Sequence, residues 1–153
     1  AMDAVRLADN QRVLCASPAY LTDRGVPQSI AELSQHSLLA AQGQLPWHLS
    51  RRGTVRVVEG PSIVSTNSSD VIRELASSGA GIALRSLWDV DALLHSGALV
   101  PILREWQAPD NLALHALTPQ GSNSAAAGAF INFVQGLLAP LKWELPNAAQ
   151  PVT

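Results

Sequence analysis

The stretch from residue 62 to residue 86 constrains the fold most, because it has the pattern of a strand, a helix and a second strand. Ile63 and Val64 form a short apolar run, and the polar run after it ends at Ser68, whose hydroxyl suits a helix N-cap. Apolar residues then recur with helical periodicity at Val71, Ile72, Leu75 and Ala76. Residues 82–84 are typical of a buried strand. The stretch therefore predicts one βαβ unit.

The direction of this unit indicates where a ligand would bind. Gly79 and Gly81 end the helix, and a βαβ crossover joins parallel strands. Ligands of open α/β sheets bind outside the carboxyl ends of the strands. At that end the sequence places Ser65, Thr66, Asn67 and Arg85. A helix N-terminus there favours an anion, although each of these residues taken singly fits an ordinary helix cap equally well.

Composition restricts the class of protein. The 153 residues are 47% hydrophobic and 14% charged, which suits one globular domain or two small lobes. The net charge is -2 and no run of basic residues is longer than Arg51-Arg52. We therefore expect that this chain does not bind DNA by itself. We expect no membrane span, no secretory leader and a cytoplasmic location, which the single Cys15 also fits. Ala1 and Met2 resemble a cloning remnant, so we expect a piece of a longer protein.

The rest of the chain predicts further short elements. Strands are expected at residues 12–16, 37–41, 55–58, 99–103 and 112–117. Helices are expected after Ser17, Ser29 and Ser86, each of which suits an N-cap, and from about Ser124. The last helix, to Leu138, has an apolar face of Phe130, Phe133, Val134, Leu137 and Leu138.

No motif predicts catalysis, a metal site or a cofactor. The four histidines are far apart in the sequence, and none has a second ligand three or four residues away. Gly79-Ala80-Gly81 follows a helix and precedes a strand, the reverse of the order in a dinucleotide-binding loop. No serine lies in a Gly-x-Ser-x-Gly elbow, and no paired acids suggest acid-base work. An enzyme is therefore the weaker hypothesis, and we expect no cofactor.

Several segments, in this order and spacing, carry a family resemblance. They are residues 12–21, Gly25 with Pro27, residues 31–33 with His36 and Leu38, residues 79–84, residues 97–100 with Leu103 and Trp106, and residues 129–134. Together, over about residues 8–138, they closely resemble the regulatory domain of LysR-type transcriptional regulators. The resemblance implies an α/β, periplasmic-binding-protein-like fold with two lobes and an effector in the cleft between them. It also implies an N-terminal winged helix-turn-helix that reads the promoter and is absent from this sequence.

The resemblance also implies a division of the chain. Residues 8–106 look like the second lobe, complete and Rossmann-like, whereas residues 107–140 look like the strand and helix that return to an incomplete first lobe. Residues 141–153 look like a mobile tail. An isolated strand and helix expose an apolar face, so we expect residues 112–138 to dock in a position unusual for the family or on another copy, by self-association.

Effector contacts in the family come from loops at the strand ends, and the matching positions here are Gln42, Gly43 and Gln44 together with Ser65, Thr66 and Asn67. The sequence departs from the family at Arg85-Ser86, where an apolar residue and proline are common. We hypothesise that Arg85 selects an anionic effector. The alternative is an exposed arginine that pairs with Glu74 or with solvent.

The leading hypothesis is an effector-sensing module of a DNA-binding regulator, with a small-molecule effector as its partner, DNA contacted only through the missing N-terminal part and no membrane. The second hypothesis is the solute-binding protein of a transporter, which shares the fold class but requires export.

Overall fold

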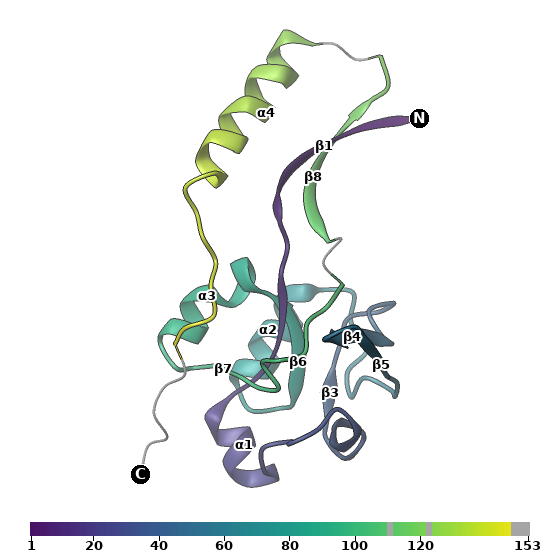
Figure 1. Cartoon of the computed structure of the whole chain (residues 1–153), viewed down its shortest axis with the longest axis vertical. Coiled ribbons are helices and arrows are strands. Elements are labelled where there is room, and N and C mark those ends of the chain that lie inside the picture. The colour runs from purple at the N-terminus through teal and green to yellow at the C-terminus, as the bar shows by residue number, and fades with distance from the viewer. Residues whose placement is uncertain (110–111, 122–123, 148–153) are drawn as a thin grey trace.

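The computed structural model describes residues 1–109, 112–121 and 124–147. In chain order the elements are β1 (Met2–Asp9), β2 (Arg12–Ala16), α1 (Pro18–Arg24), the 3-10 helix η1 (Ala31–Gln35), β3 (Leu38–Leu39), β4 (Trp47–Arg51), β5 (Thr54–Val58), α2 (Ser69–Ser77), β6 (Ile82–Ser86), α3 (Leu87–His95), β7 (Val100–Pro101), β8 (Ala113–Pro119) and α4 (Ala125–Leu138). Residues 10–109 form a body, and β1, β8 and α4 form an arm that extends from it (Figure 1).

The body is built on a four-stranded sheet in the order β3-β6-β2-β7. β3 runs parallel to β6, whereas β2 is antiparallel to both β6 and β7. Successive side chains of a strand point to opposite faces, so β2 contributes Leu14 to one apolar cluster and Val13 and Cys15 to another. The sheet therefore has a core on each face.

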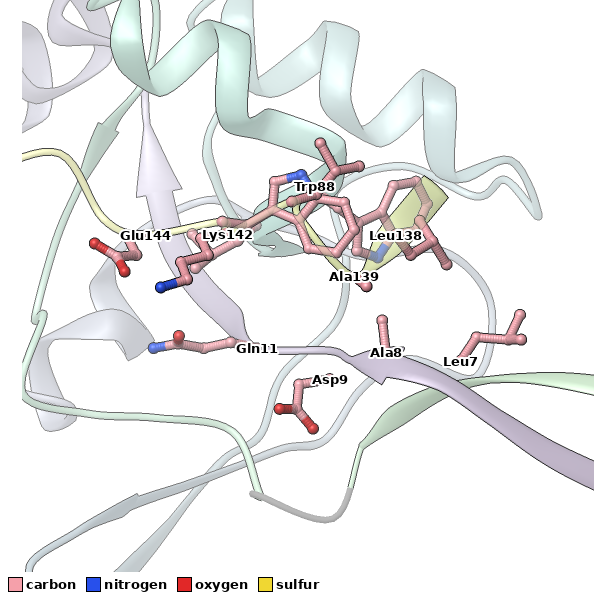
Figure 2. A pocket seen from close by; sticks show the side chains of 12 residues that line it. Leu7, Ala8, Asp9, Gln11, Trp88, Leu138, Ala139, Lys142 and Glu144 are labelled. Carbon is pink, nitrogen blue, oxygen red and sulfur yellow. The ribbon is translucent and has the colours of Figure 1, made fainter. Parts of the chain in front are cut away.

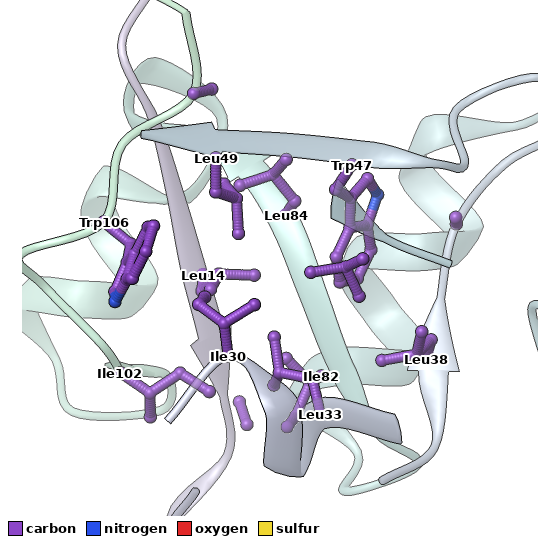
Figure 3. Close-up of a cluster of buried hydrophobic side chains, with 14 of the residues drawn as sticks. Leu14, Ile30, Leu33, Leu38, Trp47, Leu49, Ile82, Leu84, Ile102 and Trp106 are labelled. Carbon is purple, nitrogen blue, oxygen red and sulfur yellow. The ribbon is translucent and has the colours of Figure 1, made fainter. Parts of the chain in front are cut away.

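Different elements cover the two faces of the sheet. The hairpin of β4 and β5 and the 3-10 helix cover one face, where Trp47, Leu49 and Leu33 surround Leu14 and Leu84 (Figure 3). α2 and α3 cover the other face with Ile72, Ala76, Val90 and Leu94, all buried. β4 was not predicted from the sequence, because its strand depends on pairing with β5.

The stretch that set the initial prediction folds largely as expected. Ser68 caps α2 by accepting a hydrogen bond from the backbone N–H of Val71, and β6 follows the helix. The strand expected at residues 63 and 64 is absent: Ser62 makes a single parallel bridge to Leu38 instead. β3 therefore lies between Ser62 and β6, the two ends of the crossover. Its bridge to Ser62 and its pairing with β6 are both parallel, as a βαβ unit requires.

The arm consists of one long antiparallel pair and one helix. β1 pairs with β8 from Met2↔Pro119 to Asp9↔Ala113, a strand that the sequence did not predict because its partner lies more than a hundred residues away. α4 lies along β1, and Gln135 Nε2 donates to the Arg6 carbonyl at 3.0 Å. No side chain of α4 is buried, and Phe130 and Phe133 are 67% and 63% exposed. Phe130, Phe133 and Leu137 of the predicted apolar face are therefore largely uncovered, whereas Val134 and Leu138 are half-buried.

After α4 the chain returns to the body. Trp143 and Leu145 pack against the cluster beneath α2 and α3, and Arg104 Nη2 donates to the Pro146 carbonyl at 2.6 Å. The returning segment forms one wall of an open hollow of about 380 Å³, and the other walls are the end of β1 and the start of α3 (Figure 2). Residues 148–153 lie outside the described residues, and the mobility of the tail stays a prediction.

Candidate functional site

A polar hollow of about 360 Å³ lies where the body meets the arm. Its walls are Asn10 and Arg12, Gln44, the first turns of α2, the end of β6 and the start of α3, and Leu112. Asn10 and Leu112 lie on the two segments that connect body and arm, and the Asn10 N–H donates to the Leu112 carbonyl at 3.1 Å. Asn10 Oδ1 also accepts a hydrogen bond from Trp88 Nε1 at 3.1 Å. The two segments that connect body and arm therefore form part of the wall of the hollow.

The two predicted effector loops lie against each other. The Gln42 N–H donates to the Thr66 carbonyl at 2.8 Å, and Thr66 Oγ1 accepts from the Ser68 N–H at 3.1 Å. Gln44 Nε2 lies 3.5 Å from Ser69 Oγ, at the outer limit of a hydrogen bond. The loops are thus held by backbone contacts, while the Gln44 side chain is only weakly engaged.

A buried aspartate organises the charged wall of the hollow. Asp89 Oδ2 accepts from Arg85 Nε at 2.9 Å and from Arg85 Nη2 at 2.5 Å, while Asp89 Oδ1 accepts from Arg73 Nη1 at 2.7 Å. The Asp89 and Arg85 side chains are 5% and 6% exposed. The hydrogen bond to Asp89 raises the pKa of Arg73. One carboxylate therefore joins α2, β6 and α3.

Arg12 is the third arginine of the hollow. Its Nη2 donates to the Leu84 carbonyl at 2.9 Å. Burial, followed by the charge of Arg85, lowers the pKa of Arg12. Within residues 1–109, 112–121 and 124–147, no carboxylate forms an ion pair with this guanidinium. Among these residues, the hydrogen-bond acceptor found for Arg12 is the neutral carbonyl of Leu84.

The hollow contains some of the predicted residues and omits others. Of the seven residues predicted to contact an effector, Gln44 and Arg85 line it. Gln42, Gly43, Ser65, Thr66 and Asn67 lie in the adjoining loops and not in its wall. The alternative that Arg85 is exposed and pairs with Glu74 is wrong, because Arg85 is buried against Asp89 and it is Arg73 that approaches Glu74.

Sequence reasoning missed Asn10, Arg12, Arg73 and Asp89. Ser86 was predicted as an N-cap, yet its hydroxyl makes no cap hydrogen bond, and Asp89 three residues later pairs with Arg85 and Arg73. The spacing of Arg85 and Asp89, four residues apart, was the one available signal for their pairing.

Other kinds of site were also considered. Among the described residues, no group of three or more His, Cys, Asp or Glu is placed to hold a metal ion. None of the helices that the structure describes is long and apolar enough to cross a membrane.

Comparison with known sequences identifies relatives that are transcriptional regulators. The transcriptional activator TtdR of Escherichia coli is 37% identical over 110 residues, which is 69% of this chain and 36% of that protein. The regulator DmlR of Escherichia coli is 34% identical over 113 residues, 71% of this chain and 37% of that protein. The chain thus spans little more than a third of the length of these relatives.

Solved structures agree with the sequence relatives. The regulatory domain of CrgA from Neisseria meningitidis, a LysR-type regulator, superposes with a TM-score of 0.78 at 28% identity, over 90% of this chain and 69% of that one. Full-length AphB of Vibrio cholerae gives 0.78 at 27% identity, over 90% and 48%. The periplasmic-binding-protein-like α/β class is confirmed. The LysR substrate binding domain profile matches residues 1–139, and the chain therefore belongs to that family.

Proposed function

We propose that this chain senses a small-molecule effector, bound in the hollow at the junction of body and arm, for a cytoplasmic LysR-type regulator. DNA would be contacted through an N-terminal winged helix-turn-helix outside this chain. The observation that carries the proposal is the position of the hollow, whose wall includes both connecting segments, Asn10 and Leu112.

This position provides a physical route from binding to regulation. A ligand that contacts both the body and the connecting segments favours one arrangement of the two parts over the other. The ligand changes the free energy difference between the two arrangements by the difference between its binding free energies for them. If the effector changes the affinity for DNA by some factor, DNA changes the affinity for the effector by the same factor. Sensing by this route requires no chemical reaction, and we infer that the chain is not an enzyme.

The proposed contact residues are those of the two loops and the adjoining strand end: Gln42, Gly43, Gln44, Ser65, Thr66, Asn67 and Arg85. Support comes from the bond between Gln42 and Thr66, which holds the loops together, and from Gln44, whose side chain reaches the hollow. The division into a second lobe at residues 8–106 and a returning segment at 107–140 also stays a proposal. Since the relatives are helix-turn-helix regulators, a regulator is favoured over the solute-binding protein of a transporter.

The test uses the full-length gene product, its promoter DNA and a fractionated extract of small metabolites. A fraction that changes the affinity for the promoter supplies the effector, and Gln44→Ala should reduce that response at least about tenfold through loss of a polar contact with the effector. Gln28→Ala, outside the hollow, is the matched control and should respond normally. Failure of every fraction to alter promoter binding would count against effector sensing.

A further inference from the structure

The carboxylates around the hollow are unevenly shared among its arginines. Arg12, Arg73 and Arg85 line the hollow, and the nearby carboxylates of Asp70, Glu74 and Asp89 all pair with Arg73 or Arg85. A partly buried charge without a counter-charge is unfavourable, because burial removes it from water. The position of Arg12 therefore points to an anionic occupant.

The three arginines differ in how far their donors are already used. Arg85 is committed to Asp89 through both Nε and Nη2, and its side chain is 6% exposed. Arg73 contacts three carboxylates, with Asp89 at 2.7 Å, Asp70 at 3.1 Å and Glu74 at 3.5 Å. Both guanidiniums keep unused N–H donors, but a ligand would have to share their charge with carboxylates that already contact them.

Arg12 has no such commitment among the described residues. A guanidinium carries five N–H donors, and the one hydrogen bond found for Arg12 goes to a neutral carbonyl, that of Leu84, in the same strand as Arg85. The remaining donors match the forked geometry of a carboxylate. Gln44 and Ser69, weakly paired with each other at 3.5 Å, lie in the same wall and can turn to a ligand at little cost.

We propose, resting on the effector-sensing function above, that the hollow takes a small molecule bearing a carboxylate and that Arg12 binds this carboxylate. Arg85 is then a positioning residue: it holds Asp89, which in turn holds Arg73, and it adds to the positive potential. The hypothesis from the sequence that selection is made by Arg85 is thereby moved to Arg12, because Arg85 is buried and its charge is already paired with Asp89.

The experiment measures binding to the full-length protein by calorimetry at low ionic strength, where charge interactions are least screened. The probes are short mono- and dicarboxylates, the corresponding neutral amides and inorganic phosphate. The variants are Arg12→Gln, which keeps a donor for the Leu84 carbonyl, and Arg12→Lys, which keeps the charge. Arg56→Gln, on an exposed strand outside the hollow, is the control. Circular dichroism and thermal melting confirm that each variant is folded.

At least one carboxylate should bind, and its amide should not. Arg12→Gln should weaken that binding roughly tenfold to a hundredfold, the effect of losing a charge-assisted hydrogen bond, while Arg12→Lys retains part of it and Arg56→Gln all of it. Equal carboxylate affinity in Arg12→Gln and the wild type would overturn the proposal, as would phosphate binding alone or no carboxylate binding. A promoter response to a neutral metabolite without carboxylate binding would overturn the assignment of Arg12 and leave effector sensing intact.

Discussion

Arg85 donates two hydrogen bonds to one oxygen of Asp89, through Nε at 2.9 Å and through Nη2 at 2.5 Å, and both side chains are nearly inaccessible to water. The second Asp89 oxygen accepts from Arg73. Because the pair lies between the sheet and two helices, it affects the stability of the whole body as well as the polarity of the hollow.

Asp89→Asn should therefore destabilise the protein by about 3 kcal/mol, since it leaves the buried cation of Arg85 without a counter-charge. Urea unfolding measures this change as a lower midpoint with an unchanged slope. Asp91→Asn, on the same helix but 39% exposed, is the control and should change stability by less than about 1 kcal/mol. Equal losses in the two variants would show that burial of the pair has no special effect.

The thiol of Cys15 should be inert in the folded protein. Burial raises its pKa from 9.0 to about 12, against a smaller lowering by Arg85. Because the folded pKa is the higher one, this group's contribution to stability is complete below pH 9.0 and is lost as the pH rises toward about 12. Alkylation by iodoacetamide should require urea. The alkaline loss of stability should be smaller in Cys15→Ala, and an identical pH dependence would contradict the assignment.

Gly81 should not tolerate a side chain. A Cβ at this position would lie 2.4 Å from the Ser37 carbonyl oxygen, which itself accepts the Ile82 N–H at 2.9 Å where β6 begins. Gly81→Ala should lower the free energy of unfolding by about 2 kcal/mol, because the backbone at Ser37 must move to make room for the methyl group. Gly128→Ala, inside α4 with nothing near its Cβ, should instead stabilise by about 0.5 to 1 kcal/mol. Thermal unfolding measures the stability of both variants. A loss of stability in Gly81→Ala alone would show that crowding is the cause, whereas a loss in both would show that replacing a glycine is enough.

The exposed face of α4 should cause the 153-residue chain to self-associate. Phe130, Phe133 and Leu137 are each more than half exposed on one helix, an arrangement that usually marks a contact surface. Phe130→Ser with Phe133→Ser should raise the dissociation constant at least about tenfold, since each buried phenyl contributes about 1.5 to 3 kcal/mol. Val57→Ser on the body is the control for sedimentation velocity. A monomeric wild type at high concentration would contradict this expectation.

Local sequence was enough for two of the helix starts. The caps predicted at Ser17 and in the polar run that ends at Ser68 are present, and both side chains accept a backbone N–H from the first turn. These contacts join residues only three apart, so they depend mainly on local sequence. Ser29 was predicted as a cap, but the N-cap position of η1 is Ile30. Ser86 shows the limit of this inference: a residue with the same local pattern makes no cap hydrogen bond, because the backbone there is placed by its neighbours in the sheet.

The candidate site was predictable only in part. Arg85 was identified from its position at a strand end, a rule that depends on sequence order, and Gln44 from the family resemblance. Arg12 and Asn10 were not, because they reach the hollow through the pairing of β2 with β6 and through the bond between Asn10 and Leu112, contacts between residues far apart in the sequence.

For the stretch from residue 62 to residue 86, the sequence by itself determined the helix, its cap and the strand that follows. Only the tertiary structure placed β3 between the ends of the crossover, paired β1 with β8 and brought Arg73 and Arg85 to one buried carboxylate. The physical reason is the range of the interactions. Caps and apolar periodicity act within a few residues, whereas the charge state and ligand preference of the hollow arise from groups that only the packed sheet and helices bring together.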